Sequence, residues 1–377
     1  MKNTKKITGK KIPLFNIKSE YLSIKRFVDK VILRTLESNS YVLSREVENF
    51  EKELALYIGT KYCIGVASGT DALTLSLKAL GLKKGDGVII PANVYPTAFG
   101  VALSGVNIQL CDVDSGTLNL SVTNLEKSYT KKTKAIVVVH LYGNPANMTE
   151  ILKFAKKKEL YVLEDCAQSL GSSFRGKKVG TFGILSCFSF YPTKNLGAFG
   201  DGGAVLTNNR KLYEKIRRLR AYGEVTRYKS IEIGHNSRLD EIHAAILRIK
   251  LKKITKWGKK KKKIVDLYKK KLKNLPIEFV GEENLGDSLH HLVVVRTDKR
   301  DKLADYLFEK NIITGIHYPV AIHLTKSFKF LGYKKGSFPV SESASKEVLS
   351  LPMHQSLKLE EVSEVCKRIE EFFTSFK

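Results

Sequence analysis

A single lysine, Lys194, stands between an apolar segment and a glycine-rich loop, which makes it a candidate for chemistry. The segment 186–191 is rich in Phe and Ser and predicts a buried strand, and a loop with four glycines follows between 197 and 203. Nearly all of the 65 Lys and Arg residues are expected to be solvated. Lys194 differs because its neighbours are apolar, aromatic or glycine. Such surroundings suit an amine that desolvation keeps neutral and that bonds covalently to a carbonyl carbon.

Two further strand ends carry groups that could act with this lysine. Glu164 and Asp165 follow a buried run, where a carboxylate must be paired or hydrogen-bonded. The turn 67–70, Ala-Ser-Gly-Thr, leads from a strand into a helix, whose first amides can bind phosphate. Taken alone, the turn is better explained by helix capping, and Asp165 by capping of the turn that follows it. Together with Lys194 they match pyridoxal phosphate (PLP), which needs covalent attachment, a carboxylate at its pyridine nitrogen and amides at its phosphate.

The elements that must position these groups alternate along the chain. The sequence predicts strands over 62–66, 88–90, 107–110, 135–140 and 160–163, and helices over 71–80, 97–103, 122–128 and 148–158. This alternation implies parallel strands with crossover helices, hence an α/β sheet covered on both faces. Ligands of such sheets bind at the carboxyl ends of the strands, where all three candidate groups fall.

The remaining segments suggest two domains and a tail. Amphipathic helices are predicted over 21–37 and 44–57, and shorter elements begin after about 252. We predict a flexible tail over 1–12, a large domain over 13–252 and a smaller α+β domain over 253–377. In the smaller domain, strands are predicted over 291–296 and 313–317, and helices over 301–310 and 360–373. The lysine run 259–263 is expected on the solvated face of a helix.

Composition narrows the class of protein. The net charge of +27 raises the possibility of nucleic-acid binding, but the lysines are scattered and no zinc-finger, RNA-reading or basic-zipper motif accompanies them. We therefore expect no specific nucleic-acid partner, although the basic surface could attract anionic substrates. The five cysteines are far apart, which argues against disulfides or a metal site and fits a reducing cytoplasm. No apolar stretch suits a signal peptide or a membrane span, so a cytoplasmic protein without membrane contact is expected.

Several motifs, in order and spacing, resemble those of the DegT/DnrJ/EryC1/StrS sugar-nucleotide aminotransferases. They include SGTDAL, EDCAQSLGSSFRGKKVGTFG, FSFYPTKNLGAFGDGGAVLTN and NSRLDEIHAAILRIKL. The resemblance covers about residue 13 to the end of the chain. It implies the fold type I architecture of PLP-dependent aminotransferases: a large domain with a mixed, mainly parallel, seven-stranded sheet and a small C-terminal α+β domain. It also implies a homodimer with shared active sites, a nucleotide-sugar substrate and L-glutamate as the amino donor.

The resemblance assigns cofactor roles to particular residues. Lys194 would attach PLP covalently and move the proton between cofactor and substrate. Asp165 would pair with the pyridine nitrogen and Gln168 would bond the ring oxygen. The remaining cofactor contacts implied are Tyr95 stacked on the ring, Gly69, Thr70 and Ser189 at the phosphate, and Asn236 reaching the phosphate from the partner subunit.

Substrate contacts follow less directly from the resemblance. The motifs that line the substrate side contain Tyr191, Asn195, Arg238, His317 and Tyr318. Packing or capping would explain these five equally well, and Arg238 as the anchor for a glutamate carboxylate is an argument from charge.

The same motifs bear on the reaction. YPTKNLGAFGDGG resembles enzymes that aminate a 3-keto sugar more than those that act at C4, so a dTDP- or UDP-linked 3-keto sugar is expected. Amination at C4 is the alternative within the family, and a non-catalytic PLP-binding regulatory protein is the alternative of another class. The sugar dehydratase branch of the family has His in place of the lysine. The presence of Lys194 therefore argues against a dehydratase. The expected role is amino-sugar biosynthesis for surface polysaccharide such as O-antigen.

Overall fold

A seven-stranded sheet forms the centre of the larger unit in the computed structural model, which describes residues 11–281 and 286–375. The strand order is β1-β9-β8-β5-β4-β2-β3, and only β9 runs antiparallel to its neighbours. The strands are β1 (Tyr62–Val66), β2 (Gly87–Pro91), β3 (Asn107–Cys111), β4 (Thr133–Val139), β5 (Tyr161–Asp165), β8 (Leu185–Ser189) and β9 (Gly203–Thr207). This is the mixed, mainly parallel α/β sheet predicted from the sequence.

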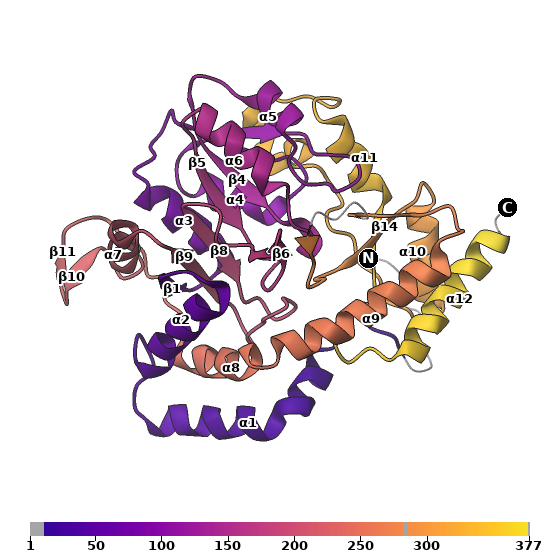
Figure 1. Cartoon of the computed structure of the whole chain (residues 1–377), viewed down its shortest axis with the longest axis horizontal. Helices are drawn as coiled ribbons and strands as arrows, with labels where there is room; N and C mark the ends of the chain where they lie inside the picture. Colours follow the sequence, from indigo (N-terminus) through magenta and orange to yellow (C-terminus); the bar gives the residue numbers. More distant parts are fainter. Residues whose placement is uncertain (1–10, 282–285, 376–377) are drawn as a thin grey trace.

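Helices cover both faces of this sheet (Figure 1). Their apolar sides build the buried clusters on either face, because strands such as β2 are buried along their whole length. The helices of the large unit are α1 (Ile17–Glu37), α2 (Arg45–Ile58), α3 (Gly69–Ala79), α4 (Tyr95–Ala102), α5 (Val122–Ser128), α6 (Met148–Lys157), α7 (Arg210–Leu219) and α8 (Glu241–Leu251). Short strands β6 (Ser173–Phe174), β7 (Lys177–Lys178) and β13 (Gly286–Asp287) form a separate small sheet, and β10 (Glu224–Thr226) and β11 (Lys229–Ser230) form a hairpin beyond α7.

The helix α9 (Ile254–Leu272) leads from the large unit to the smaller one (Figure 1). There it packs on α12 (Leu359–Ser375) and contributes to a second core. That unit also contains β12 (Glu278–Phe279), β14 (Val293–Arg296) and β15 (Val348–Leu351), together with α10 (Arg300–Glu309) and α11 (Pro339–Glu347). None of the helices in the described ranges combines the length and apolar content that a membrane span requires.

Three details differ from the sequence-based predictions. The segment 313–317 is not a strand; Gly315 forms only an isolated bridge with Ser350. Residues 1–10 of the predicted tail lie outside the described residues, but Ile12 is buried in the core of the smaller unit and pairs with Ile312. In the lysine run 259–263, Lys261 is buried while its neighbours are exposed, because a helix turns one residue of such a run toward the core.

The strand register fixes the level at which the site lies. Asp165 ends β5 and aligns with Val139 on β4 and with Cys187 on β8. β4 and β5 therefore end at the same level and β8 continues to Ser189, so the segments that follow the three strands surround a common space.

Candidate active site

A cavity of about 350 Å³ lies at these carboxyl ends. It receives residues from β5, β8, the start of α3 and the segment 317–318. Of the residues singled out from the sequence, it is lined by Gly69, Thr70, Asp165, Gln168, Ser189, Tyr191, Lys194, His317 and Tyr318. Strand-end reasoning thus brought together Gly69, Asp165 and Lys194, whereas His317 and Tyr318 were predicted from the family motifs.

Lys194 enters the cavity from a tight loop after β8. The backbone amide of Lys194 donates to Tyr191 O at 2.9 Å, and that of Ala198 donates to Phe190 O at 2.7 Å. Gly197 has no room for a side chain, because a Cβ there would lie 2.4 Å from Pro192 O. The Nζ of Lys194 has no hydrogen-bond or ion-pair partner among the described residues. Burial lowers the pKa of Lys194 to about 8, although Asp165 opposes this shift.

Asp165 is the buried acid of the cavity. Its carboxylate accepts hydrogen bonds from Thr97 Oγ1 at 2.7 Å and from the amide of Ala167 at 3.0 Å. Burial raises the pKa of Asp165 above its usual value, and these two hydrogen bonds oppose the shift. Asp165 forms no ion pair within the described part of the chain. A cation bound in the cavity would therefore favour its ionised form.

The start of α3 supplies a site for an anion. The Oγ of Ser68 caps the helix by accepting from the amide of Asp71 at 3.0 Å. The amides of Gly69 and Thr70 belong to the first turn, which has no intrahelical acceptors, so they can donate to a ligand. Gly69 is required here, because a Cβ at this position would lie 2.7 Å from the Cβ of Ser189.

A residue that the sequence did not single out, Ser237, holds this turn in place. Its hydroxyl accepts from the amide of Ala67 at 3.1 Å and donates to Asp71 at 2.7 Å. Thr97, Phe15 and His291 are further cavity residues missed from the sequence. Thr97 lies in the first turn of α4, the helix that follows β2, and Phe15 and His291 follow no strand end either.

Gln168 is oriented by the backbone. Its Oε1 accepts from the amide of Tyr142 at 2.8 Å, so its Nε2 is the donor and contacts Tyr318 Oη at 3.2 Å. Next to it, Nδ1 of His317 lies 2.8 Å from Ser350 Oγ. Burial and the nearby Lys194 lower the pKa of His317 to about 4, so this histidine is neutral at pH 7.

Four predicted site residues do not line the cavity of this chain. Tyr95 packs on Phe99, with ring centroids 4.8 Å apart, and its centroid lies 6.5 Å from that of Tyr318. The side chain of Asn195 accepts from Lys261 instead of facing the cavity. Arg238 is absent from the lining, and Asn236 lies on the surface, which is compatible with the contact to a partner subunit predicted for it.

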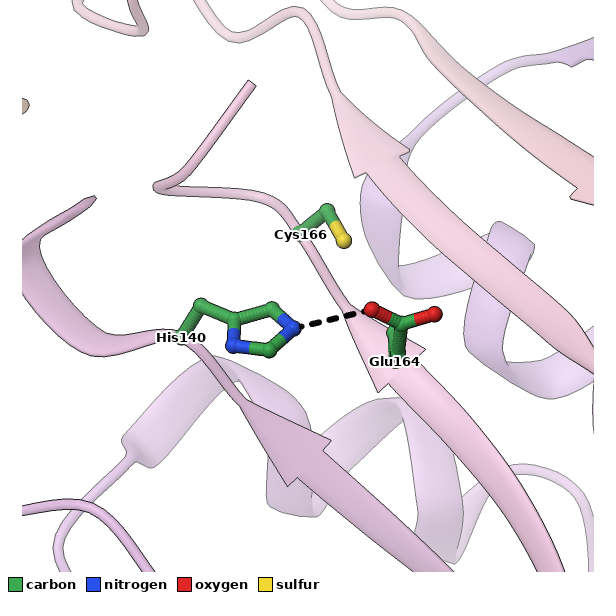
Figure 2. Close-up of side chains that lie close together, drawn as sticks. All are labelled: His140, Glu164 and Cys166. Carbon is green, nitrogen blue, oxygen red and sulfur yellow. Dashed lines mark hydrogen bonds and ion pairs between the residues drawn. The ribbon is translucent and has the colours of Figure 1, made fainter. Parts of the chain in front are cut away.

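Behind Asp165 lies a buried cluster of His140, Glu164 and Cys166 (Figure 2). Their potential ligand atoms lie within 4.8 Å of one another, the spacing of a metal site. The Nε2 of His140 donates to Glu164 at 3.1 Å, and its Nδ1 accepts from the amide of Ala146 at 3.0 Å. Both nitrogens of His140 are thus engaged with the protein.

Glu164 is engaged as well, because its carboxylate accepts three backbone amides, each at 2.7 Å, from Gly180, Phe182 and Gly183. Successive strand residues point to opposite faces, so Glu164 anchors this loop while Asp165 faces the cavity. The cluster braces the strand end that carries Asp165.

The residues of the cavity fit PLP. Within the described part of the chain, Lys194 offers an amine without a partner, Asp165 a buried carboxylate without a cation, and the start of α3 amides without intrahelical acceptors. These are the three groups that the aldehyde, the pyridine nitrogen and the phosphate of PLP require. The fold and this arrangement define a fold type I aminotransferase.

Comparison with known proteins agrees with this class of enzyme. The sequence profile of the DegT/DnrJ/EryC1/StrS aminotransferase family matches residues 23–370, and the chain belongs to this family. These aminotransferases and their solved neighbours depend on PLP, and so does this protein.

Individual relatives cover nearly the whole chain. A "pleiotropic regulatory protein" of Geobacillus stearothermophilus is 38% identical, over 97% of this chain and 99% of its own. The "dTDP-3-amino-3,6-dideoxy-alpha-D-galactopyranose transaminase" of Aneurinibacillus thermoaerophilus is 40% identical, over 96% of this chain and 99% of its own. Among solved structures, DesV of S. venezuelae, in complex with a ketimine intermediate, has a TM-score of 0.94 and 37% identity. The match covers 97% of this chain and 99% of DesV. The ntda protein of Bacillus subtilis, with bound PMP, has a TM-score of 0.88 and 28% identity. The match covers 99% of this chain and 87% of that protein.

Proposed function

We propose that this aminotransferase moves an amino group from L-glutamate to a dTDP- or UDP-linked keto-deoxysugar, at C3 of the sugar. The observation that carries the proposal is the amine of Lys194, which lines the same cavity as Asp165 and has no partner among the residues that the structure describes. The relatives named as transaminases of 3-amino sugars support the choice of substrate, and the segment around Lys194 supports C3.

Lys194 is suited to carry a proton in this reaction. With a pKa of about 8 instead of 10.5, a useful fraction of its amine is neutral near pH 7, so the group can both accept and return a proton. When bound, PLP supplies an electron sink that stabilises the negative charge left on carbon after proton removal. Asp165 would support this by favouring positive charge at the pyridine nitrogen, and Nε2 of Gln168 would be the donor to the ring oxygen.

Other cavity residues would bind the substrates. Tyr191, His317 and Tyr318 lie where a sugar could contact them, and neutral His317 can hydrogen-bond a hydroxyl group without adding charge. Asn195 and Arg238 do not line the cavity of the single chain, so a substrate contact by either residue stays a prediction.

We also propose a homodimer in which the partner's hairpin region completes the site. Apolar side chains of this region are exposed in the single chain, with Tyr228 at 84% and Ile233 at 92%. Monomeric proteins rarely leave such groups together in water, so they suit a subunit interface. Asn236 lies at the base of the same segment and would reach the partner's phosphate site. The proposed setting is the cytoplasm, in amino-sugar synthesis for surface polysaccharide such as O-antigen.

A regulatory function is the second candidate, because one relative is named a pleiotropic regulatory protein. The two functions separate in one experiment. The purified protein is incubated with L-glutamate and a panel of dTDP- and UDP-linked 3-keto and 4-keto sugars, and products are identified by mass and NMR.

An amino group at C3 supports the proposal, and one at C4 replaces it with the alternative within the family. A yellow protein that stays inert with glutamate and with every sugar supports the regulatory function. Tight, salt-sensitive binding to DNA or RNA would contradict the expectation of no nucleic-acid partner.

A further inference from the structure

Two buried lysines lie behind the loop that carries Lys194. Lys250 on α8 is 0% exposed and Lys261 on α9 is 6% exposed. Lysine is rarely buried to this extent, because its charge must then be compensated by the protein. Both lysines donate to the first residues that follow Lys194, so their position concerns the active site.

Lys250 holds the backbone of the loop. Its Nζ donates to Gly197 O at 2.6 Å and forms an ion pair with Glu20 of α1, also at 2.6 Å. The same ammonium group lies 4.0 Å from the ring centroid of Phe199. One cation therefore connects α1, α8 and the loop, and the carboxylate compensates its charge.

Lys261 holds the side chain next to Lys194. Its Nζ donates to Asn195 Oδ1 at 2.7 Å, and Asn195 is itself buried at 8% exposure. The Nδ2 of Asn195 has no partner among the described residues, so Lys261 is the only group that fixes this amide. Lys261 shares the buried face of α9 with Trp257 and Ile264, and it thus extends a contact from the smaller unit to the loop.

The direction of these contacts suggests more than packing. An apolar side chain would fill the same space on each helix without the cost of burying an ammonium group. Instead, the two cations are directed at acceptors within three residues of Lys194, one on the backbone and one on a side chain. These contacts fix the peptide that follows Lys194, and hence the point from which its long side chain reaches the cavity.

We propose that Lys261, together with Lys250, is a positioning residue that holds Lys194 in register with Asp165. This inference rests on the proposed role of Lys194. Misplacement of a reacting group by about 1 Å can cost about 10²-fold in rate, so loss of the Lys261 contact should lower turnover by about 10- to 100-fold.

The test compares the variants K261M, N195A and K261M/N195A with K263M, which replaces an exposed lysine two positions further along the same helix. PLP-loaded proteins are measured without substrate by absorbance and by circular dichroism in the visible region. The dichroism per unit absorbance reports how rigidly the lysine-bound cofactor is oriented. Urea unfolding of the PLP-free proteins reports stability separately.

We expect K261M and N195A to lower this dichroism to a similar extent, and the double variant to lower it no further, because both remove one contact. K263M should match the wild type. Dichroism of K261M equal to that of K263M, or independent effects of K261M and N195A that add, would overturn the inference. If K261M does not fold, N195A tests the inference alone, because it removes the same contact by changing the acceptor in the loop. A wild-type protein that binds no PLP at Lys194 would instead contradict the proposed function.

Discussion

The two sides of the Lys194 loop treat their charged groups in opposite ways. On the cavity side, Lys194 and Asp165 form no ion pair within the described residues, although burial shifts the pKa of both. On the opposite side, Lys250 is paired with Glu20, and Lys261 donates to Asn195. Among the described residues, lysine thus has no partner on one side of the loop, whereas on the other side each lysine has a hydrogen-bond or ion-pair partner.

This difference separates residues that await a ligand from residues that hold the structure. A buried charge without a partner destabilises a protein, so it persists where a ligand supplies the missing partner. A paired buried charge contributes geometry and leaves nothing for a ligand to bind. The cluster of His140 and Glu164 belongs to the second kind, because its polar atoms are engaged with backbone amides and with each other.

Replacement of Lys194 should have the largest effect. In K194A the group that attaches the cofactor and carries the proton is lost, so turnover should fall on the order of 10⁴-fold. The absorption band of the lysine-bound cofactor should disappear as well. Turnover assays and visible absorbance check this, with K263M as the control on the exposed face of α9. An active K194A would show that this side of the loop is not the reacting side.

Asp165 comes next. D165N keeps the size of the side chain and one acceptor but removes the charge that favours a protonated pyridine nitrogen. Loss of one preorganised electrostatic contact costs about 10²- to 10³-fold, and turnover should fall by that amount. PLP should still bind, which separates this effect from loss of the site. The replacement of Asp201, an exposed cavity residue, by Asn is the matched control and should change turnover far less.

On the paired side, the expected loss is in stability. E20Q leaves Lys250 buried without its carboxylate, and breaking a buried pair in this way costs about 3 to 5 kcal/mol. Urea unfolding of the PLP-free protein measures the free energy. D266N removes the exposed ion pair with Lys262 and should cost under about 1 kcal/mol. Equal losses in the two variants would contradict the distinction between buried and exposed pairs.

The cavity side was largely predictable from the sequence. Strand patterns located the ends of β5 and β8 to within about two residues, and parallel pairing placed Asp165 and Lys194 at one edge of the sheet. Family motifs added Gln168, Ser189 and Tyr318, which line the cavity. Their functional roles stay predictions.

The paired side could not be predicted in the same way. Lys261 lies in a run of five lysines, and the sequence does not show which member of the run faces the core. The side that a helix buries depends on its packing with distant segments, here the loop at Asn195. Ile12 was missed for a similar reason, since its strand-like pairing with Ile312 joins residues 300 positions apart.

The smallest effect expected is a pH dependence of stability that originates on the paired side. Burial lowers the pKa of Lys261 from 10.5 to about 8, so between these values the unfolded chain binds a proton that the folded chain does not. Stability contributed by this residue therefore rises with pH across that window and is constant below it. In K261M this contribution is absent, while Lys194 titrates in both proteins. The free energy of unfolding of the wild type minus that of K261M should thus increase from pH 8 to pH 10, in urea titrations of the PLP-free proteins. A difference that stays flat would mean that Lys261 keeps its ordinary pKa, and that the two sides of the loop differ in desolvation as well as in pairing.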